Sequence, residues 1–239
     1  CKKNNNTMET HNRFDIKQQL GEGSFSKIYQ AYDKHLKREV ALKVEKEDKH
    51  KKILKFEYEI LRNLQGKYII IVGLPHIPKL YDFVENKTLN FIVMELLGKN
   101  VANYKKSKHD FNPLCAIDIL IQMLNSIEAL HDRGYIHRDI KPTNFVMGKY
   151  LPNDAKAENI VYMVDFGLAK LHLDKNMKAI PPRANTDFRG TLTYASLNAH
   201  NKKELSRRDD LWSFFFVILD LLNETLPWRN CKDDKVLLV

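Results

Sequence analysis

The stretch Tyr135–Met147, YIHRDIKPTNFVM, decides how this sequence is interpreted. Apolar residues lead into it and close it, and strongly polar groups lie between them: His137, Arg138, Asp139, Lys141 and Asn144. This is too much polarity for a core strand, and an idle surface loop would not be bracketed so regularly by apolar residues. Asp139 and Lys141 are two residues apart, so in an extended loop their side chains point the same way. A carboxylate beside an ammonium can accept a proton from a hydroxyl while the cation stabilises developing negative charge.

A second motif, Asp165-Phe166-Gly167, follows the apolar run Ile160–Val164 and begins 26 residues after Asp139. A carboxylate at the end of a buried strand is well placed to hold a cation, and Asn144 adds a neutral oxygen suited to Mg²⁺. Each short string alone also fits a solvated turn. Together, H-R-D-I-K-P-T-N and D-F-G resemble the catalytic loop and the metal-binding motif of protein kinases.

The beginning of the chain carries a glycine-rich turn between two predicted strands, Phe14–Gly21 and Lys27–Ala31. The turn is the stretch Gly21–Ser26, GEGSFS. Glycines here let the backbone approach a phosphate and offer it N–H groups, although a plain hairpin turn fits the same residues. No helix follows directly, which disfavours a dinucleotide-binding fold. Ser26 stands where the kinase pattern has a third glycine.

The run Glu39–Glu45 places Lys43 inside an apolar strand. A buried ammonium is costly unless it is paired, and the alternative is a lysine that reaches water from a strand edge. Ile53, Ile60, Leu61 and Leu64 then recur at helical spacing. Glu57 lies on the same face of this predicted helix. The pair Lys43–Glu57 resembles the kinase pair that orients nucleotide phosphates. Without that resemblance, Glu57 would be interpreted as an exposed flanking residue.

Further elements follow from periodicity. Pro78–Val84 and Leu89–Met94 are predicted strands, and Glu95–Gly98 is a predicted connector. Leu114–His131 is a predicted helix with one apolar stripe, formed by Ile117, Leu120, Ile121, Leu124 and Ile127. Ser206–Leu222 begins with Ser206 and Asp209, the spacing of a capping box. That helix is apolar nearly all round, which predicts that it is buried.

The kinase resemblance extends from residue 14 to about residue 235. It implies an α+β, bilobal fold, with residues 1–13 as a disordered lead-in. It assigns residues 14–97 to a small β-rich N-lobe with one helix, and residues 98–239 to a mainly helical C-lobe that lacks its last helices. Asp210 would anchor the backbone of the catalytic loop.

The same resemblance implies ATP and Mg²⁺ as ligands. The expected catalytic residues are Asp139, Lys141 and Asn144, and the expected Mg²⁺ ligands are Asn144 and Asp165. The connector would bind adenine, with Met94 as gatekeeper. The expected nucleotide contacts are Gly21, Glu22, Gly23, Ser24, Ile28, Ala41, Lys43, Glu57, Met94, Glu95, Leu97 and Val146.

Lys141 is similar to its counterpart in serine/threonine kinases. The strings NFVMG at 144–148, GTLTYASLN at 190–198 and RRDDLWS at 207–213 resemble the casein kinase I superfamily. PPRA at 181–184 and FRGT at 188–191 look most like the tau-tubulin kinase branch. Thr193 departs from the arginine usual in casein kinase I relatives, which is associated with anion binding. Arg183, Arg189 and Lys202 are alternative cations for an acidic substrate.

Composition limits the other readings. Lys and Arg exceed Asp and Glu by 39 − 30 = 9, which favours acidic partners such as nucleotide phosphates, acidic protein segments or nucleic acid. No zinc spacing or RNA-binding aromatic motif supports a nucleic-acid-binding domain. Three widely separated cysteines fit a reducing compartment. We expect a monomer that acts on Ser and Thr of protein substrates and does not associate with a membrane. Its expected location is the cytoplasm, or also the nucleus. The alternative is a pseudokinase that binds partners without phosphotransfer.

Overall fold

The computed structural model of the chain describes residues 13–23, 25–46, 53–66, 76–85, 89–107, 111–151, 153–154, 156–223 and 226–229. The chain forms two compact units. The first comprises Cys1–Tyr58 and Lys79–Leu96, and the second comprises Glu59–Pro78 and Leu97–Val239. The helix α1 (Ile53–Gln65) begins in the first unit and ends in the second. Of the expected lead-in 1–13, residues 1–12 lie outside the described residues, as does the turn residue Ser24. Arg13 is described and pairs with Asp33 at 2.7 Å, so disorder is wrong for that residue.

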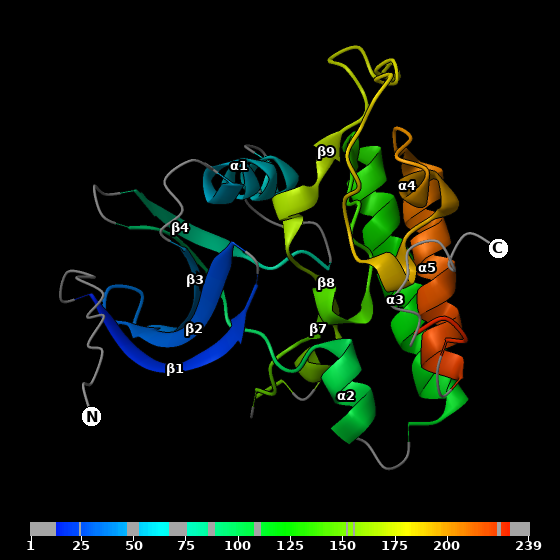
Figure 1. Cartoon of the computed structure of the whole chain (residues 1–239). Coiled ribbons are helices and arrows are strands. Elements are labelled where there is room, and N and C mark those ends of the chain that lie inside the picture. Colours follow the sequence, from blue (N-terminus) through cyan, green and yellow to red (C-terminus); the bar gives the residue numbers. More distant parts are fainter. Residues whose placement is uncertain are drawn as a thin grey trace, which may run out of the picture. The chain divides into compact units, whose positions relative to one another are not determined.

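The first unit is built on a five-stranded sheet with the order β1-β2-β3-β5-β4, in which every neighbouring pair is antiparallel (Figure 1). All five predicted strands are present, with ends shifted by one or two residues. Their bounds are β1 Phe14–Glu22, β2 Ser26–Asp33, β3 Arg38–Glu45, β4 Leu80–Glu85 and β5 Asn90–Glu95.

One face of β3 forms the core of this unit. Val40, Leu42 and Val44 alternate along the strand, are at most 5% exposed, and pack with Phe91 and Val93 of β5. Burial of these branched and aromatic side chains is the main favourable contribution to folding here.

The opposite face of β3 carries Ala41 and Lys43, because successive side chains alternate in direction. Residues directly opposite each other in an antiparallel pair share a face. Ile28 of β2 lies opposite Lys43, and Met94 of β5 lies opposite Ala41. The strand register therefore gathers four of the residues predicted to contact nucleotide on one face of the sheet.

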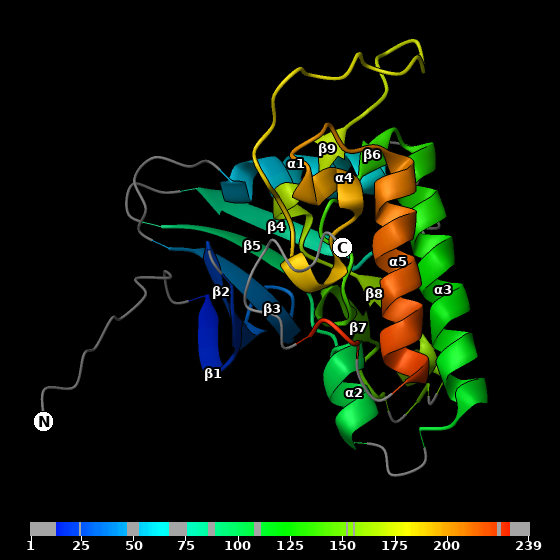
Figure 2. The ribbon, with the colours of Figure 1, turned by 45° about the vertical axis from the view of Figure 1, so that its right-hand side comes forward.

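The second unit is mostly helical. Its α-helices are α2 (Val101–Ser107), α3 (Pro113–Asp132), α4 (Leu197–His200) and α5 (Arg207–Leu222). Two short ladders join β6 (Tyr135–Ile136) to β9 (Lys170–Leu171) and β7 (Phe145–Met147) to β8 (Val161–Met163). Its described residues also form the 3₁₀ turns η1 (Pro142–Asn144), η2 (Ala157–Asn159), η3 (Phe166–Leu168) and η4 (Leu192–Tyr194). The long helices α3 and α5 lie side by side in both ribbon views (Figures 1 and 2).

The buried face of α3 differs from the predicted stripe. Leu120 and Ile127 are buried as predicted, but Ile117, Ile121 and Leu124 are 45%, 53% and 43% exposed. The buried face instead comprises Ala116, Ile119, Leu120, Met123, Ser126, Ile127, Leu130 and His131. Small residues such as Ala116 and Ser126 permit close approach to neighbouring elements, and an apolar pattern alone undervalues them. Among the described helices, α3 is long and apolar enough to cross a membrane by length and composition, a test that core helices also pass.

The helix α5 begins with the predicted capping box, in which Asp209 accepts a hydrogen bond of 2.7 Å from the Ser206 N–H. The predicted burial of α5 is confirmed for one face only. The helix packs against α3 and η4, so only the face toward them is buried. Its other face exposes 44–52% of four large side chains: Leu211, Trp212, Phe215 and Leu222.

Two substitutions in α3 test which of its faces is packed. Ile127→Ala should lower the free energy of unfolding by about 2–4 kcal/mol, because it leaves a cavity in the core. Ile121→Ala makes the same chemical change at an exposed position and should cost less than about 1 kcal/mol. Urea unfolding of the two variants measures both values, and equal losses would contradict the observed orientation of α3.

Candidate active site

The loop between β6 and η1 is held by the carboxylate of Asp210 from α5. This carboxylate accepts hydrogen bonds of 2.8 Å from the main-chain N–H groups of His137 and Arg138, and lies 2.8 Å from His131 Nε2. Asp210 is 2% exposed, so three partners offset the cost of burying its charge. The predicted anchoring of the catalytic-loop backbone by Asp210 is confirmed.

Arg138 adopts a φ of 66°, a left-handed conformation that is strained for a residue with a side chain. Its Nε donates to the carbonyl of Leu168 in η3 at 2.7 Å. Burial lowers the pKa of the Arg138 guanidinium to about 10, and the charges of Arg189 and Arg183 act in the same direction. The Asp210 and Leu168 contacts together hold the backbone turn that presents Asp139.

Asp139 lies at the centre of a hydrogen-bonded cluster. Its Oδ2 is 2.7 Å from Lys141 Nζ, and its Oδ1 accepts a bond of 2.7 Å from the Thr191 hydroxyl. Lys141 Nζ also donates to Thr191 Oγ1 at 3.0 Å, which closes a triangle. The predicted convergence of Asp139 and Lys141 is confirmed. An acceptor, a cation and a hydroxyl within hydrogen-bonding distance of one another can accept a proton and stabilise negative charge.

Asn144 joins this cluster through its amide nitrogen, which donates to the Asp139 carbonyl at 2.9 Å and to Asp139 Oδ2 at 3.2 Å. The side-chain oxygen of Asn144 is therefore the atom suited to a cation. The Asn144 carbonyl accepts from Val164 N at 2.9 Å, so Asn144 lies beside the residue that precedes Asp165. Asp165 is exposed and has a φ of 66°.

The chemistry of Asn144 and Asp165 fits Mg²⁺, which takes one or two protein oxygens and completes its octahedron with water and phosphate. Among the described residues no group of three His, Cys, Asp or Glu is arranged to hold a metal.

Lys43 and Glu57 form a buried ion pair within the first unit. Lys43 Nζ lies 2.7 Å and 2.6 Å from the two carboxylate oxygens of Glu57, and the side chains are only 7% and 2% exposed. The predicted pairing is present, and the reading of Lys43 as a strand-edge lysine is wrong. Lys43 lies on the face of the sheet shared with Ile28, Ala41 and Met94, and Glu57 balances the charge of its ammonium.

The turn between β1 and β2 keeps space open at its glycines. A Cβ added to Gly21 would meet nothing within 4 Å, and one added to Gly23 would meet only Ser26 atoms at 3.8 Å and 3.9 Å. Neither glycine has a positive φ. Neighbouring atoms therefore do not require glycine at these positions, which leaves room for a ligand close to the backbone. Glu22 projects outward and pairs with Lys46 at 2.5 Å.

The remaining predicted contacts lie at the ends of strands. The N–H of Glu95, the last residue of β5, donates to Lys79 O at 2.8 Å, so its carbonyl is the main-chain group suited to a ligand. Leu97 and Val146 are half-buried, and both belong to the second unit. Their role in nucleotide binding stays a prediction, like that of the other site residues.

Sequence reasoning missed Thr191, although it lies within the GTLTYASLN string. The signal that could have identified it is Gly190, which has a φ of 105°. A Cβ at Gly190 would lie 2.6 Å from the carbonyl oxygen of Arg138. A glycine with this conformation and such a close approach marks the point where the segment touches the catalytic loop.

Comparisons with known proteins agree with this geometry. Residues 14–238 match the protein kinase domain family. The chain is 37% identical over 223 residues to a protein of Dictyostelium discoideum named as a serine/threonine-protein kinase, covering 92% of this chain and 43% of that protein. It is 35% identical to casein kinase I homolog 3 of Schizosaccharomyces pombe, over 95% of this chain and 49% of that protein. A Caenorhabditis elegans protein named as a casein kinase I is 33% identical, over 93% of this chain and 63% of its own length. The chain thus spans roughly half the length of these relatives.

The ion pair between Lys43 and Glu57 can be tested by stability alone. Glu57→Gln should lower the free energy of unfolding by about 3–5 kcal/mol, because it leaves a buried ammonium without its carboxylate. The double variant Lys43→Met/Glu57→Leu should recover most of that loss, since no charge remains to be desolvated. Lys17→Met, which removes one partner of the exposed pair with Glu39, should change stability by less than about 1 kcal/mol. Urea unfolding measures all three, and a loss in the double variant as large as in Glu57→Gln would contradict the argument.

Proposed function

The chain belongs to the protein kinase family, and we propose that it transfers the γ-phosphoryl group of ATP to Ser or Thr hydroxyls of protein substrates. Its fold is the bilobal α+β fold of that family, with a β-sheet N-lobe and a helical C-lobe. The observation that carries the proposal is the cluster of Asp139, Lys141 and Thr191, in which a carboxylate, an ammonium and a hydroxyl are mutually bonded.

In the proposed reaction the substrate hydroxyl binds Asp139, and its oxygen attacks the γ-phosphorus. The hydroxyl proton passes to the Asp139 carboxylate, and the bond from phosphorus to the β,γ-bridging oxygen breaks to release ADP. Lys141, 2.7 Å from Asp139, stabilises charge on the transferring group. Phosphoryl transfer needs little covalent catalysis by the protein, so catalysis comes from positioning and electrostatic stabilisation.

Nucleotide binding is proposed for the face of the sheet that carries Ile28, Ala41, Lys43 and Met94. Lys43 would hold the α- and β-phosphates, and Glu57 would fix the position of its ammonium. The backbone at Gly21 and Gly23 would cover the phosphates, and the main chain at Glu95 and Leu97 would bind adenine. Asn144 and Asp165 would hold Mg²⁺, which when bound neutralises charge on the phosphates.

The serine/threonine class is supported by the names of the relatives and by Lys141. Within that class we propose the casein kinase I superfamily, and the tau-tubulin kinase branch for its PPRA and FRGT strings.

Phosphotransfer to casein and to a basic protein from labelled ATP–Mg²⁺ tests the proposed activity. Asp139→Asn should lower kcat by about 10²–10⁴-fold because the proton acceptor is lost. Asp165→Ala should lower it by at least about a hundredfold because charge stabilisation by the metal is lost. Asp132→Asn, an exposed change at the end of α3, is the matched control and should leave kcat unchanged. A folded wild-type chain that binds ATP–Mg²⁺ without transfer would instead be a pseudokinase.

We propose that a preference for acidic substrates would depend on cations without a strong partner of their own. Arg183 is committed to Glu204 at 2.6 Å, so Arg189 and Lys202 are the better candidates for an acidic substrate. Arg189→Ala and Lys202→Ala should each raise KM for an acidic peptide by about two- to fivefold, the effect of one exposed charge pair. KM for a neutral peptide should not change. Lys106→Ala, an exposed change on α2, is the control, and an unchanged KM for the acidic peptide in both variants would exclude this role.

A further inference from the structure

Glu204, just before α5, joins three parts of the second unit that are distant in sequence. Its Oε1 lies 2.8 Å from Lys170 Nζ in β9, and its Oε2 lies 2.6 Å from Arg183 Nε. The main-chain N–H of Arg183 also donates to Oε2, at 3.3 Å. A second tie runs in parallel, because the Thr186 hydroxyl donates to the carbonyl of Lys202 at 2.7 Å. The segment 172–189 is the projecting yellow loop in Figures 1 and 2. These bonds hold the part of the loop that leads back to η4.

This carboxylate is not an ordinary surface partner. Its side chain is 8% exposed, whereas that of Arg183 is 55% exposed. The hydrogen bond from Arg183 is the largest cause that lowers the pKa of Glu204 to about 2, so the group stays ionised at neutral pH. Exposed ion pairs contribute little because water screens them, and a largely buried carboxylate with two cationic partners is screened much less.

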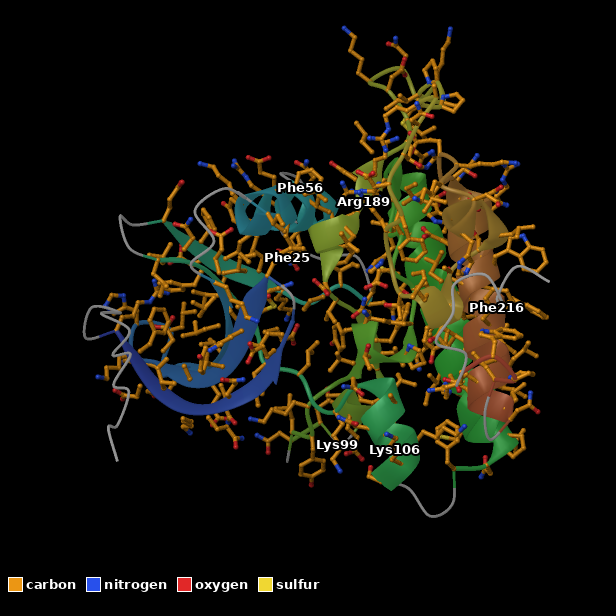
Figure 3. All side chains as sticks on the ribbon, in the orientation of Figure 1. Phe25, Phe56, Lys99, Lys106, Arg189 and Phe216 are labelled. Atoms are coloured by element: carbon orange, nitrogen blue, oxygen red, sulfur yellow. The ribbon has the colours of Figure 1, made fainter. Side chains whose placement is uncertain are left out.

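Positive charge surrounds Glu204. Lys170 and Arg183 contact it directly, and the buried guanidinium of Arg138 interacts with its charge as well as with that of Asp210. Arg189, labelled in Figure 3 on the stretch that leads into η4, adds to the positive charge that Arg138 experiences. Without the Glu204 carboxylate, Lys170, Arg183, Arg189 and Arg138 would repel one another across this part of the unit.

The charge cluster adjoins the reacting groups through the chain. Arg138 directly precedes Asp139, and Gly190 approaches the Arg138 carbonyl so closely that a Cβ would lie 2.6 Å from it. The next residue, Thr191, donates to Asp139. A displacement of residues 183–190 would therefore be transmitted to the bond between Thr191 and Asp139.

We propose that Glu204 is a positioning residue, an anion that holds the segment 170–191 against the catalytic loop and so shapes the substrate-hydroxyl site. This inference rests on the proposed kinase function. Glu204 touches neither the reacting hydroxyl nor Asp139, so its effect passes through Lys170, Arg183 and the chain between them.

Hydrogen–deuterium exchange and kinetics of Glu204→Ala test the proposal in the full chain. Exchange of the amides in 181–190 should accelerate, while that of β3 stays unchanged. With a peptide substrate, kcat should fall by about ten- to a hundredfold, because a remote change that misplaces a reacting group by about 1 Å can cost about a hundredfold. KM for ATP should stay within about twofold of its wild-type value. Arg183→Gln changes an exposed partner, keeps the fold secure, and should reproduce both effects in weaker form.

Anion rescue separates charge from packing. Sulfate should restore slow exchange in 181–190 and part of the activity of Glu204→Ala, because it replaces the missing negative charge among the same cations. Sodium chloride at equal ionic strength should not restore them. Lys170→Met/Glu204→Ala should lose the rescue, because one of the receiving cations is gone.

The possible outcomes divide clearly. Wild-type exchange in 181–190 of Glu204→Ala, or recovery with sodium chloride as complete as with sulfate, would overturn the proposed role. The exchange measurement does not depend on catalysis. If the wild-type chain showed no phosphotransfer, the proposed kinase function would be excluded, and the exchange data would still decide whether Glu204 anchors the segment.

Discussion

The buried carboxylate of Asp210 is the interaction on which the rest of the site depends. An ionised group that is 2% exposed is tolerated only where donors surround it, and two consecutive main-chain N–H groups and His131 provide them. Two consecutive N–H groups can point at one carboxylate only if the backbone turns sharply, and Arg138 takes a left-handed conformation there. The cost of that conformation is offset by the charge it satisfies. The direction in which Asp139 emerges follows from this turn.

The same short stretch of chain holds two further segments. Glu204 bonds to Lys170 and Arg183, and Asp209 accepts bonds from Ser196 and Asn198 at 2.8 Å and 3.0 Å. Within seven residues, three carboxylates thus fix the loop before Asp139, the segment that follows η3 and the start of α4. Each acid is largely buried and therefore requires its partners. Residues 204–210 therefore hold three separate segments of the second unit through buried charge.

The parts that local pattern could predict are those with a local cause. The five strands follow from alternation and the capping box from the spacing of Ser206 and Asp209. The cost of burying an ammonium predicts that Lys43 has a partner, but only the kinase resemblance identified that partner as Glu57. Which face of α3 is buried depends on neighbours, so Ile121 was predicted inside and lies outside. Thr191 and Glu204 bond to partners 52 and 21 residues away, a separation that no periodicity encodes. The roles of the nucleotide and metal residues remain predictions from resemblance.

Gly21 and Gly190 are glycines for different structural reasons. In the sequence, each of them indicates only a turn or a loop. In the structure, Gly190 is required by the chain itself, because its φ is positive and a Cβ would strike the Arg138 carbonyl. At Gly21 neither cause exists. Glycine loses more backbone entropy on folding than other residues do. At Gly21, neither packing nor a positive φ offsets that cost. Its presence fits a ligand that approaches the main chain of this turn, as a phosphate would in the proposed nucleotide site beside Lys43.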